Sequence, residues 1–290
     1  MTDHPTPPEP DSPAPARTGF RVKLWGVRGS LPVSGADFRK FGGNTICVEM
    51  RCGDHVLLFD AGSGLQPAGK ALMAEGIRDF ALLFSHWHYD HVMGLPFFVP
   101  LYDKTARLRI LSGHMSDAMT TAQMMAELMR QPFFPVGPDV CRAHIATQDF
   151  LAGDVLTLFP GVTIRTGNLN HPGRSTGYRV EWGGRSVALI TDTEHEPGTL
   201  DQGVLDLIRG ADLFLYDASF EEPELEIFRG FGHSSWQQGI LLAKAAGVGQ
   251  LGFIHHAKWR TDVELGRIER MARKAFPGAF CGRDYQEIDI

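Results

Sequence analysis

Residues 80–94 read FALLFSHWHYDHVMG, and this stretch decides how the rest of the sequence is interpreted. Its first five residues form a continuous apolar run, which is typical of a β-strand covered on both faces. His86, His88, Asp90 and His91 follow within six positions. Buried singly, each would need a polar partner, but at the carboxyl end of a strand they can converge on a ligand. The stretch therefore predicts a metal site at a strand end, the alternative being an exposed polar turn.

Apolar side chains recur with strand and helix periods on both sides of this loop. Strands are expected at residues 20–25, 44–51, 55–60, 80–84 and 107–111, and helices at residues 67–75 and 115–130. Further along, strands are expected at residues 154–158, 162–167, 176–182, 185–191, 212–217 and 250–254, and helices at residues 201–209, 235–246 and 262–276. The pattern predicts one α/β (α+β) domain over residues 18–290, a four-layer αβ/βα sandwich of two mixed β-sheets flanked by helices.

Several local features refine this expectation. Trp87 and Tyr89 alternate with the histidines and are expected to point away and anchor the loop. The helix at 115–130 carries a methionine stripe, which is typical of a core or of a pocket lining. With the loop at 132–140 it forms an insertion around residues 104–150 that we interpret as a lid. Capping boxes are expected at Ser235-x-x-Gln238 and Thr261-x-x-Glu264.

The composition limits the classes of partner. A formal net charge of −6 provides no global attraction to nucleic acid or anionic membranes, so nucleic acid is a less favoured partner, although a local basic groove would be compatible with it. Residues 1–17 contain six of the 18 prolines and predict a disordered tail. Apolar stretches of membrane-helix length, signal-peptide features and paired cysteines are not found. We expect a cytoplasmic protein with reduced thiols.

One loop cannot complete two metal sites, so further ligands are expected at other strand ends. His171, Asp192 and His255 each follow an expected apolar strand. Each alone could be a hydrogen-bonded loop residue, but together with the first loop they suit a shared rim. His256 is an alternative to His255; the alternation of apolar residues through Leu251 and Phe253 favours His255.

These residues lie in motifs that resemble a known superfamily. HWHYDH at 86–91 is similar to the HxHxDH signature of the metallo-β-lactamase superfamily. TDT at 191–193, DLFLYDASF at 212–220 and GHSS at 232–235 resemble its ribonuclease Z and phosphodiesterase branch. The openings GVRGSLPVSG and FGGNTICVEM look like those of small phosphodiesterase-like members. The resemblance covers roughly residues 20–290 and implies the metallo-β-lactamase fold.

The resemblance also implies a set of ligands for two divalent metal ions, which zinc suits and which manganese or iron could also use. One metal would be held by His86, His88 and His171, the other by Asp90, His91 and His255, and Asp192 would bridge them. Asp60 is similar to an aspartate of the superfamily that supports the metal loop from behind.

The implied chemistry is hydrolysis by a metal-bridging hydroxide. Asp90 would bind metal and orient the hydroxide. Asp217 and His233 resemble the acid–histidine pair that protonates the leaving alkoxide; the alternative for His233 is a neighbour of the helix cap. Arg174 could clamp a phosphate or be a surface charge.

The leading hypothesis is a phosphodiesterase acting on a small substrate such as a cyclic nucleotide. A tRNA 3′-processing endoribonuclease is an alternative, but the insertion is rich in Met and Phe and not in Gly and Lys. A lactone or thioester hydrolase that uses the same metals is a second alternative. A non-catalytic metal-binding regulator is an alternative of a different class. The resemblance also allows a homodimer.

Overall fold

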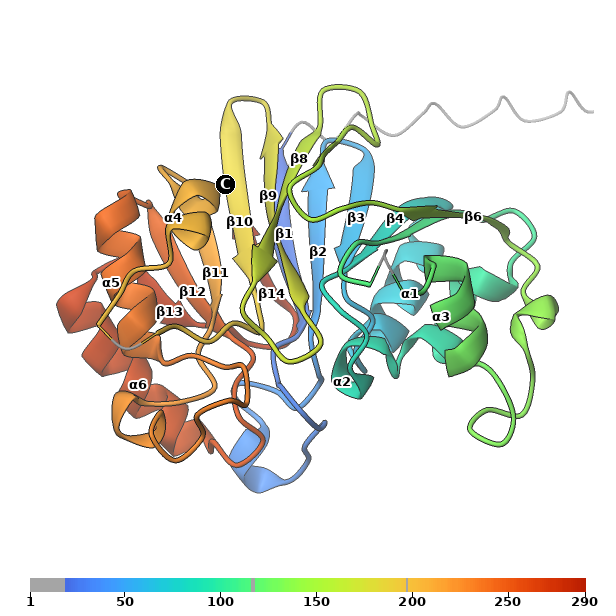
Figure 1. Ribbon diagram of the computed structural model, residues 1–290. Coiled ribbons are helices and arrows are strands. Elements are labelled where there is room, and N and C mark those ends of the chain that lie inside the picture. Colours follow the sequence, from blue (N-terminus) through green and yellow to red (C-terminus); the bar gives the residue numbers. More distant parts are fainter. Residues whose placement is uncertain (1–18, 116–117, 197) are drawn as a thin grey trace, which may run out of the picture.

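The computed structural model describes residues 19–115, 118–196 and 198–290. The predicted tail at 1–17 lies outside these residues. Figure 1 shows two β-sheets side by side in the centre, with α1 and α3 flanking one of them and α4, α5 and α6 flanking the other. The predicted four-layer sandwich of two mixed sheets is confirmed.

Each sheet has seven strands. The first has the order β14-β1-β2-β3-β4-β5-β6, and its strands are Gln286–Asp289, Phe20–Gly26, Cys47–Cys52, His55–Phe59, Asp79–Phe84, Arg107–Ser112 and His144–Asp149. The second has the order β13-β12-β11-β10-β9-β8-β7, and its strands are Ala279–Cys281, Gln250–Ile254, Leu213–Asp217, Arg185–Ile190, Ser175–Trp182, Thr163–Leu169 and Val155–Leu156. The C-terminal strand β14 pairs with β1, so the first sheet contains both ends of the described chain.

Most of the helices cover the outer faces of the sheets. They are α1 (Leu65–Ala74), α2 (Tyr89–Val92), α3 (Thr121–Leu128), α4 (Gln202–Ile208), α5 (Trp236–Ala246) and α6 (Asp262–Ala275). Short 3-10 helices lie at Ala36–Phe38, Leu95–Phe97, Val99–Tyr102, Pro138–Val140 and Glu222–Glu224. One apolar core fills the space between the sheets, and two others lie under the outer helices. The run at 80–84 is fully buried, because Ala81 and Leu83 face the central core while Phe80, Leu82 and Phe84 face the helices.

The predicted helix at 115–130 is wrong in its first part. Helix α3 begins after Thr120, whose side chain accepts a hydrogen bond from the amide of Gln123 while Gln123 bonds back, and this capping box fixes the start. Met115 and Met119 therefore lie in the preceding loop, and Ala122 is exposed. At Thr261 the predicted capping box is present in full, whereas Ser235 caps α5 by accepting from the amide of Gln238.

Three strands were not predicted. The edge strand β6 is mostly exposed and polar, and β13 and β14 have only three and four residues. Such segments show too little apolar alternation to be recognised. Strands β5 and β6, which fall within the predicted insertion around residues 104–150, belong to the first sheet. Only the residues between these two strands therefore project beyond the sheet.

The strand directions determine where the site forms. Strands β3, β4, β5 and β6 are parallel, as are β10, β11, β12 and β13. The carboxyl ends of β3, β4, β10, β11 and β12 meet at one edge of the sandwich, which Figure 1 shows below the sheets near α2. The Thr176 amide donates to the Ser85 carbonyl at 2.9 Å and joins the two sheets there.

Candidate metal centre

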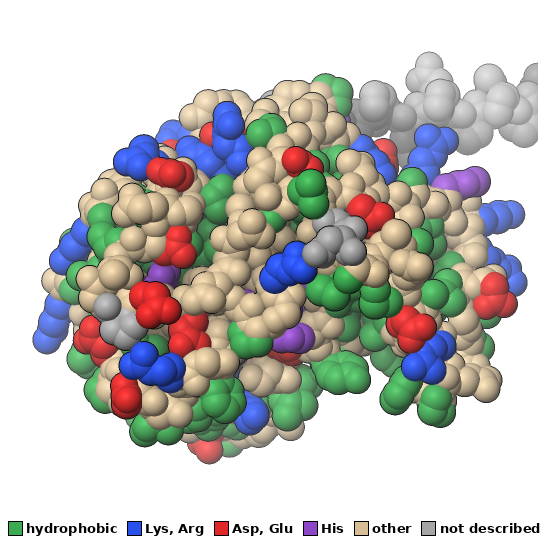
Figure 2. Space-filling model, viewed as in Figure 1, with side chains coloured by type: hydrophobic (Ala, Val, Ile, Leu, Met, Phe, Trp, Pro, Cys, Tyr) green, Lys and Arg blue, Asp and Glu red, His purple; other side chains and the backbone are tan. Residues whose placement is uncertain are grey.

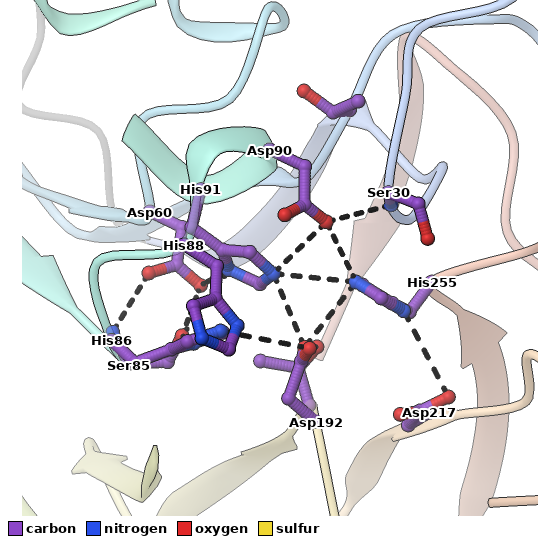
Figure 3. A network of polar contacts seen from close by, with 12 residues as sticks. Ser30, Asp60, Ser85, His86, His88, Asp90, His91, Asp192, Asp217 and His255 are labelled. Atoms are coloured by element: carbon purple, nitrogen blue, oxygen red, sulfur yellow. Dashed lines mark hydrogen bonds and ion pairs between the residues drawn. The ribbon is translucent and has the colours of Figure 1, made fainter. Parts of the chain in front are cut away.

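The loop that follows β4 is fixed from behind by one aspartate. Asp60, fully buried after β3, accepts hydrogen bonds from the Ser85 amide at 2.7 Å and the Ser85 hydroxyl at 2.8 Å. Its second oxygen also lies 2.9 Å from Nδ1 of His91. Because Nδ1 is occupied, Nε2 of His91 is directed into the site, as Figure 3 shows. Asp60 thus holds Ser85 and His91 of the loop in place.

A first group of ligand atoms gathers around one oxygen of Asp192. His86, His88 and His171 offer nitrogens within 4.8 Å of one another. Nε2 of His171 lies 3.1 Å from Nδ1 of His88, and Nε2 of both His86 and His171 lies 3.7 Å from Oδ2 of Asp192.

A second group surrounds the other oxygen of Asp192. Nε2 of His91 and of His255 lie 3.2 Å and 3.3 Å from Oδ1 of Asp192. Oδ2 of Asp90 lies 3.2 Å from Nε2 of His255 and 3.5 Å from Nε2 of His91. Asp192 thus faces one group with each oxygen, which is the arrangement of a bridging carboxylate (Figure 3).

These distances fit divalent ions. Tetrahedral ligands about 2.0–2.1 Å from a zinc ion lie about 3.3–3.4 Å apart, close to the separations in both groups. Nε2 of His86 is buried and has no hydrogen-bond partner among the described residues, and a divalent cation would satisfy it. The donors are imidazoles and carboxylates, which suit zinc, manganese or iron.

The charges around the site also fit a cation. Burial alone would raise the pKa of Asp192 and lower that of His91. The surrounding histidines instead hold the pKa of Asp192 well below its usual range, and the carboxylates of Asp192, Asp90 and Asp60 raise the pKa of His91 well above its own. For His86, burial and neighbouring imidazoles lower the pKa, which favours the neutral imidazole that can bind a metal. The buried carboxylates therefore need positive charge, which a metal supplies without protonating the ligands.

His255, and not His256, lies in the site. The ring of His256 turns the other way, and its Nε2 donates to the Gly282 carbonyl at 3.0 Å. His255, Asp60 and Asp192 all have positive φ angles, which are 57°, 61° and 55°. Backbone strain of this kind is concentrated at functional sites.

His233 and Asp217 form a pair beside the ligand groups. Nδ1 of His233 donates to Oδ2 of Asp217 at 2.8 Å, and the other oxygen of Asp217 accepts from the amide and hydroxyl of Ser219 at 3.0 Å and 2.8 Å. Burial lowers the pKa of His233, but Asp217 outweighs it and raises the pKa to about 9. Asp217 and His233 also form a candidate cation group with Asp192 and His255. Both oxygens of Asp217 already accept hydrogen bonds from groups of the chain.

Several contributors were not anticipated. The Ser30 amide donates to Oδ2 of Asp90 at 2.7 Å and orients it. A Cβ atom on Gly29 would lie 2.2 Å from the His255 ring, so only glycine allows this approach. The hydroxyl of Ser219 lies 3.1 Å from Nδ1 of His255. These contacts join segments far apart in the chain and leave no local signal in the sequence.

Two expectations for the loop have different outcomes. Trp87 does anchor it, since its ring packs on Phe84 with centroids 4.4 Å apart and its Nε1 donates to the Ser112 hydroxyl at 3.1 Å. Tyr89 does not, because it begins α2 and is 75% exposed.

Arg174 is exposed beside Gly173 at the edge of a cavity that also reaches His88.

Residues 55–256 match the family model described as a beta-lactamase superfamily domain. The chain belongs to the metallo-β-lactamase superfamily. This member is 31% identical over 107 residues to ribonuclease Z of Lacticaseibacillus casei, a match that spans 37% of this chain and only 32% of that protein. It is 24% identical over 294 residues to ribonuclease Z of Treponema pallidum, covering 84% of this chain and 91% of that protein.

Solved structures of the superfamily have the same fold. The metallo-beta-lactamase fold protein YhfI from Bacillus subtilis has a TM-score of 0.71 at 19% identity, covering 94% of this chain and 100% of that one. A diphosphatase from the PhnP family has a TM-score of 0.69 at 17% identity, covering 93% and 97%. Zinc-bound PqqB from Methylobacterium extorquens has a TM-score of 0.69 at 16% identity, covering 93% and 100%. The predicted resemblance is confirmed, and a metal-dependent hydrolase agrees with it. Within the described residues no helix is long and apolar enough to span a membrane.

Proposed function

We propose that this chain is a binuclear metal-dependent hydrolase that cleaves small phosphodiesters, with cyclic nucleotides as one candidate class. The observation that carries the proposal is the two ligand groups that share Asp192, next to His233 held by Asp217. Divalent ions, zinc in the first place, would supply water activation and neutralise charge on the phosphoryl oxygens. The remaining tasks belong to the protein.

The first task is to protonate the leaving group. A phosphodiester releases an alkoxide, which is a poor leaving group unless it receives a proton. His233 carries that proton, because Asp217 raises its pKa to about 9, and its fixed Nδ1 contact leaves Nε2 as the donor. The ring lies among the walls of a cavity of about 440 Å³ that is also lined by Asp90 and Asp192. A leaving oxygen bound in this central cavity is therefore next to His233.

The second task is to select the size and charge of the substrate. A cavity of about 630 Å³, here called the acidic cavity, lies on the other side of His233 and is lined by Glu194, Glu196, Glu222 and Glu226. Figure 2 shows acidic side chains on the lower left of the molecule, over this region. Because carboxylates repel a chain of phosphates, this surface disfavours a polyanionic leaving group. A small diester brings only one negative charge to the metals.

A second candidate function is tRNA 3′ processing. It is favoured by the curated relatives, which carry the name ribonuclease Z, including one that this chain covers over 91% of its length. The acidic cavity and the net charge of −6 oppose it.

The test is a parallel assay of the zinc-loaded and manganese-loaded protein on bis(p-nitrophenyl) phosphate, cyclic nucleotides, a lactone and a precursor tRNA. We expect turnover of the small diesters, and its loss in Asp90→Ala, whose metal content is measured in parallel. Asp103→Ala, which removes a partly exposed aspartate at the end of a 3-10 helix, is the matched control and should be fully active. Cleavage of precursor tRNA at a higher kcat/KM than any diester, or activity on the lactone alone, would overturn the proposal.

A further inference from the structure

A second large cavity opens beside the metal centre on the side opposite the acidic cavity. It has a volume of about 660 Å³, and His86 and His88 form its inner end. We call it the apolar cavity, because most of its remaining wall is apolar: Trp87, Val92, Met115, Met119, Met124, Leu128 and Phe133. Pockets of about 300–1,000 Å³ are of the size that holds small organic ligands.

Most of the apolar wall comes from the segment between β5 and β6. Met124 is buried on α3, Met119 lies just before the helix, and Phe133, 70% exposed, lies at the rim after it. The Arg130 guanidinium lies over the Phe133 ring, 5.3 Å from its centroid. On the face drawn in Figure 2, hydrophobic side chains gather in the lower right, over the region of α3 and the segment after it.

The wall nearest the metals is held rigidly. The Ser112 hydroxyl accepts from Nε1 of Trp87 and lies 3.2 Å from Nδ1 of His114, which is buried and faces His86 with ring centroids 6.3 Å apart. Methionines form the outer wall, and their flexible thioether chains adapt to differently shaped apolar groups. At the rim, Arg174 lies near Arg130, whose charge is offset by an ion pair with Glu127 of the same wall.

The position of His233 assigns a direction to a bound diester. Its phosphorus carries two unesterified oxygens, which the metals would bind, one leaving oxygen and one retained ester oxygen. His233 lines the central and acidic cavities but not the apolar cavity. The leaving group therefore lies on the His233 side, and the retained substituent is directed away from it, towards His88 and the apolar cavity.

We propose that the apolar cavity is a specificity subsite that receives an aryl or bulky apolar substituent retained on the phosphoryl group of the substrate. This inference rests on the proposed phosphodiesterase function. In the reaction, the oxygen of water bonds to phosphorus and the bond from phosphorus to the leaving oxygen breaks. The leaving alkoxide takes a proton from His233, which regains one from the water, and an acyclic diester gives an alcohol and an aryl or alkyl phosphate monoester.

The experiment compares methyl p-nitrophenyl phosphate with phenyl p-nitrophenyl phosphate. Both release p-nitrophenolate, so only the retained substituent differs, and each rate is divided by that of alkaline hydrolysis to remove intrinsic reactivity. We expect kcat/KM to favour the phenyl diester by at least about tenfold, because apolar groups that fill a pocket give discrimination of this order.

The double variant Met119→Ser/Phe133→Ser should reduce the phenyl-to-methyl ratio at least about threefold, because it removes apolar wall. Leu151→Ser is the matched control: Leu151 is 61% exposed, lies just after β6 and does not line the cavity, so the ratio should not change. Equal kcat/KM values for the two diesters, or a ratio that survives in the double variant, would overturn the subsite while leaving the phosphodiesterase proposal intact.

Binding of phosphonates tests the subsite without turnover. We expect calorimetry on the zinc-loaded protein to show phenylphosphonate binding at least about tenfold more tightly than methylphosphonate, with this preference reduced in the double variant. If neither diester is hydrolysed but the preference for phenylphosphonate is present, the proposed function fails and the subsite stands. Equal affinities for the two phosphonates would refute the subsite. A cavity that is covered by a second copy of the chain would also give this result.

Discussion

Replacing Gly29 by alanine should displace one metal ligand and leave the fold intact. A Cβ atom at this position would lie 2.2 Å from Cε1, 2.3 Å from Nδ1 and 2.7 Å from Nε2 of His255. Ordinary contacts of a Cβ atom are 3.4–4 Å long, so the imidazole would have to move by about 1 Å. The ring has little room to do so, because Ser219 lies on its Nδ1 and the rings of His91 and His233 lie beside it, 5.3 Å and 4.9 Å away between centroids.

The size of the effect follows from the tolerance of metal coordination. Ligand distances are kept within about 0.2 Å, and an error of about 1 Å in a catalytic group costs roughly 100-fold in rate. We therefore expect Gly29→Ala to lower kcat/KM at least about 100-fold, and to weaken the affinity of the site formed by Asp90, His91 and His255 by roughly 10–100-fold. Metal affinity is measured by competition with a chromogenic chelator, and metal content by elemental analysis.

The matched control is Gly19→Ala. Gly19 lies just before β1, and a Cβ atom there would meet nothing within 4 Å, so its metal affinity and activity should equal those of the parent protein. Thermal unfolding of both variants shows whether they fold. If folded Gly29→Ala binds two metal ions with unchanged affinity and turns over normally, His255 is not a ligand of the kind inferred here.

Four other predictions follow from the same structure. Gly232→Ala should weaken metal binding through His171, because its Cβ atom would lie 2.1 Å from Nδ1 of that histidine and its φ of 81° disfavours a side chain; unchanged metal content in a folded variant would contradict this. Asp217→Asn should slow release of alkyl alcohols by roughly 100-fold or more but affect p-nitrophenolate release much less, because His233 is needed only for basic leaving groups; an equal loss for both leaving groups would be evidence against its role as proton donor. Zinc at 100 times its dissociation constant should stabilise the fold by about 2.7 kcal/mol per site and raise Tm by roughly 5–10 °C relative to chelator-treated protein; calorimetric traces that coincide would show that the ligand groups do not bind it. Burial raises the pKa of Glu49 from 4.5 to about 7, a shift that its ion pair with Arg51 opposes. Between these pH values the folded chain holds more protons, so the free energy of unfolding falls as pH rises, by at most about 1.4 kcal/mol per pH unit. Denaturant unfolding at pH 5 and pH 7 should give a smaller slope for Glu49→Gln, and equal slopes would mean that Glu49 does not titrate in this range.

The interpretation of His255 shows both the reach and the limit of sequence reasoning. Its place after an apolar strand predicted a ligand, and it lies among Asp90, His91 and Asp192. The alternation argument that favoured it over His256 does not carry past β12, however. Alternation holds only for extended backbone, and His255 has a φ of 57°. Its direction is determined by the turn and by Ser219, which the periodicity does not describe.

The sequence by itself determined the elements whose signal is local. A buried strand followed at once by His86, His88, Asp90 and His91 specifies both a strand and its ligand-rich end, because covalent neighbours fix these positions relative to one another. The same applies to the capping box at Thr261, which fixes the start of α6 within three residues.

Only the tertiary structure decided the features that depend on distant segments. The closeness of Gly29 to His255, the pairing of β14 with β1 and the apolar cavity beside His88 each join residues that lie far apart along the chain. Such contacts form because two sheets pack across a common core and bring their strand ends together, and the free energy of that packing is not contained in any single stretch of the sequence.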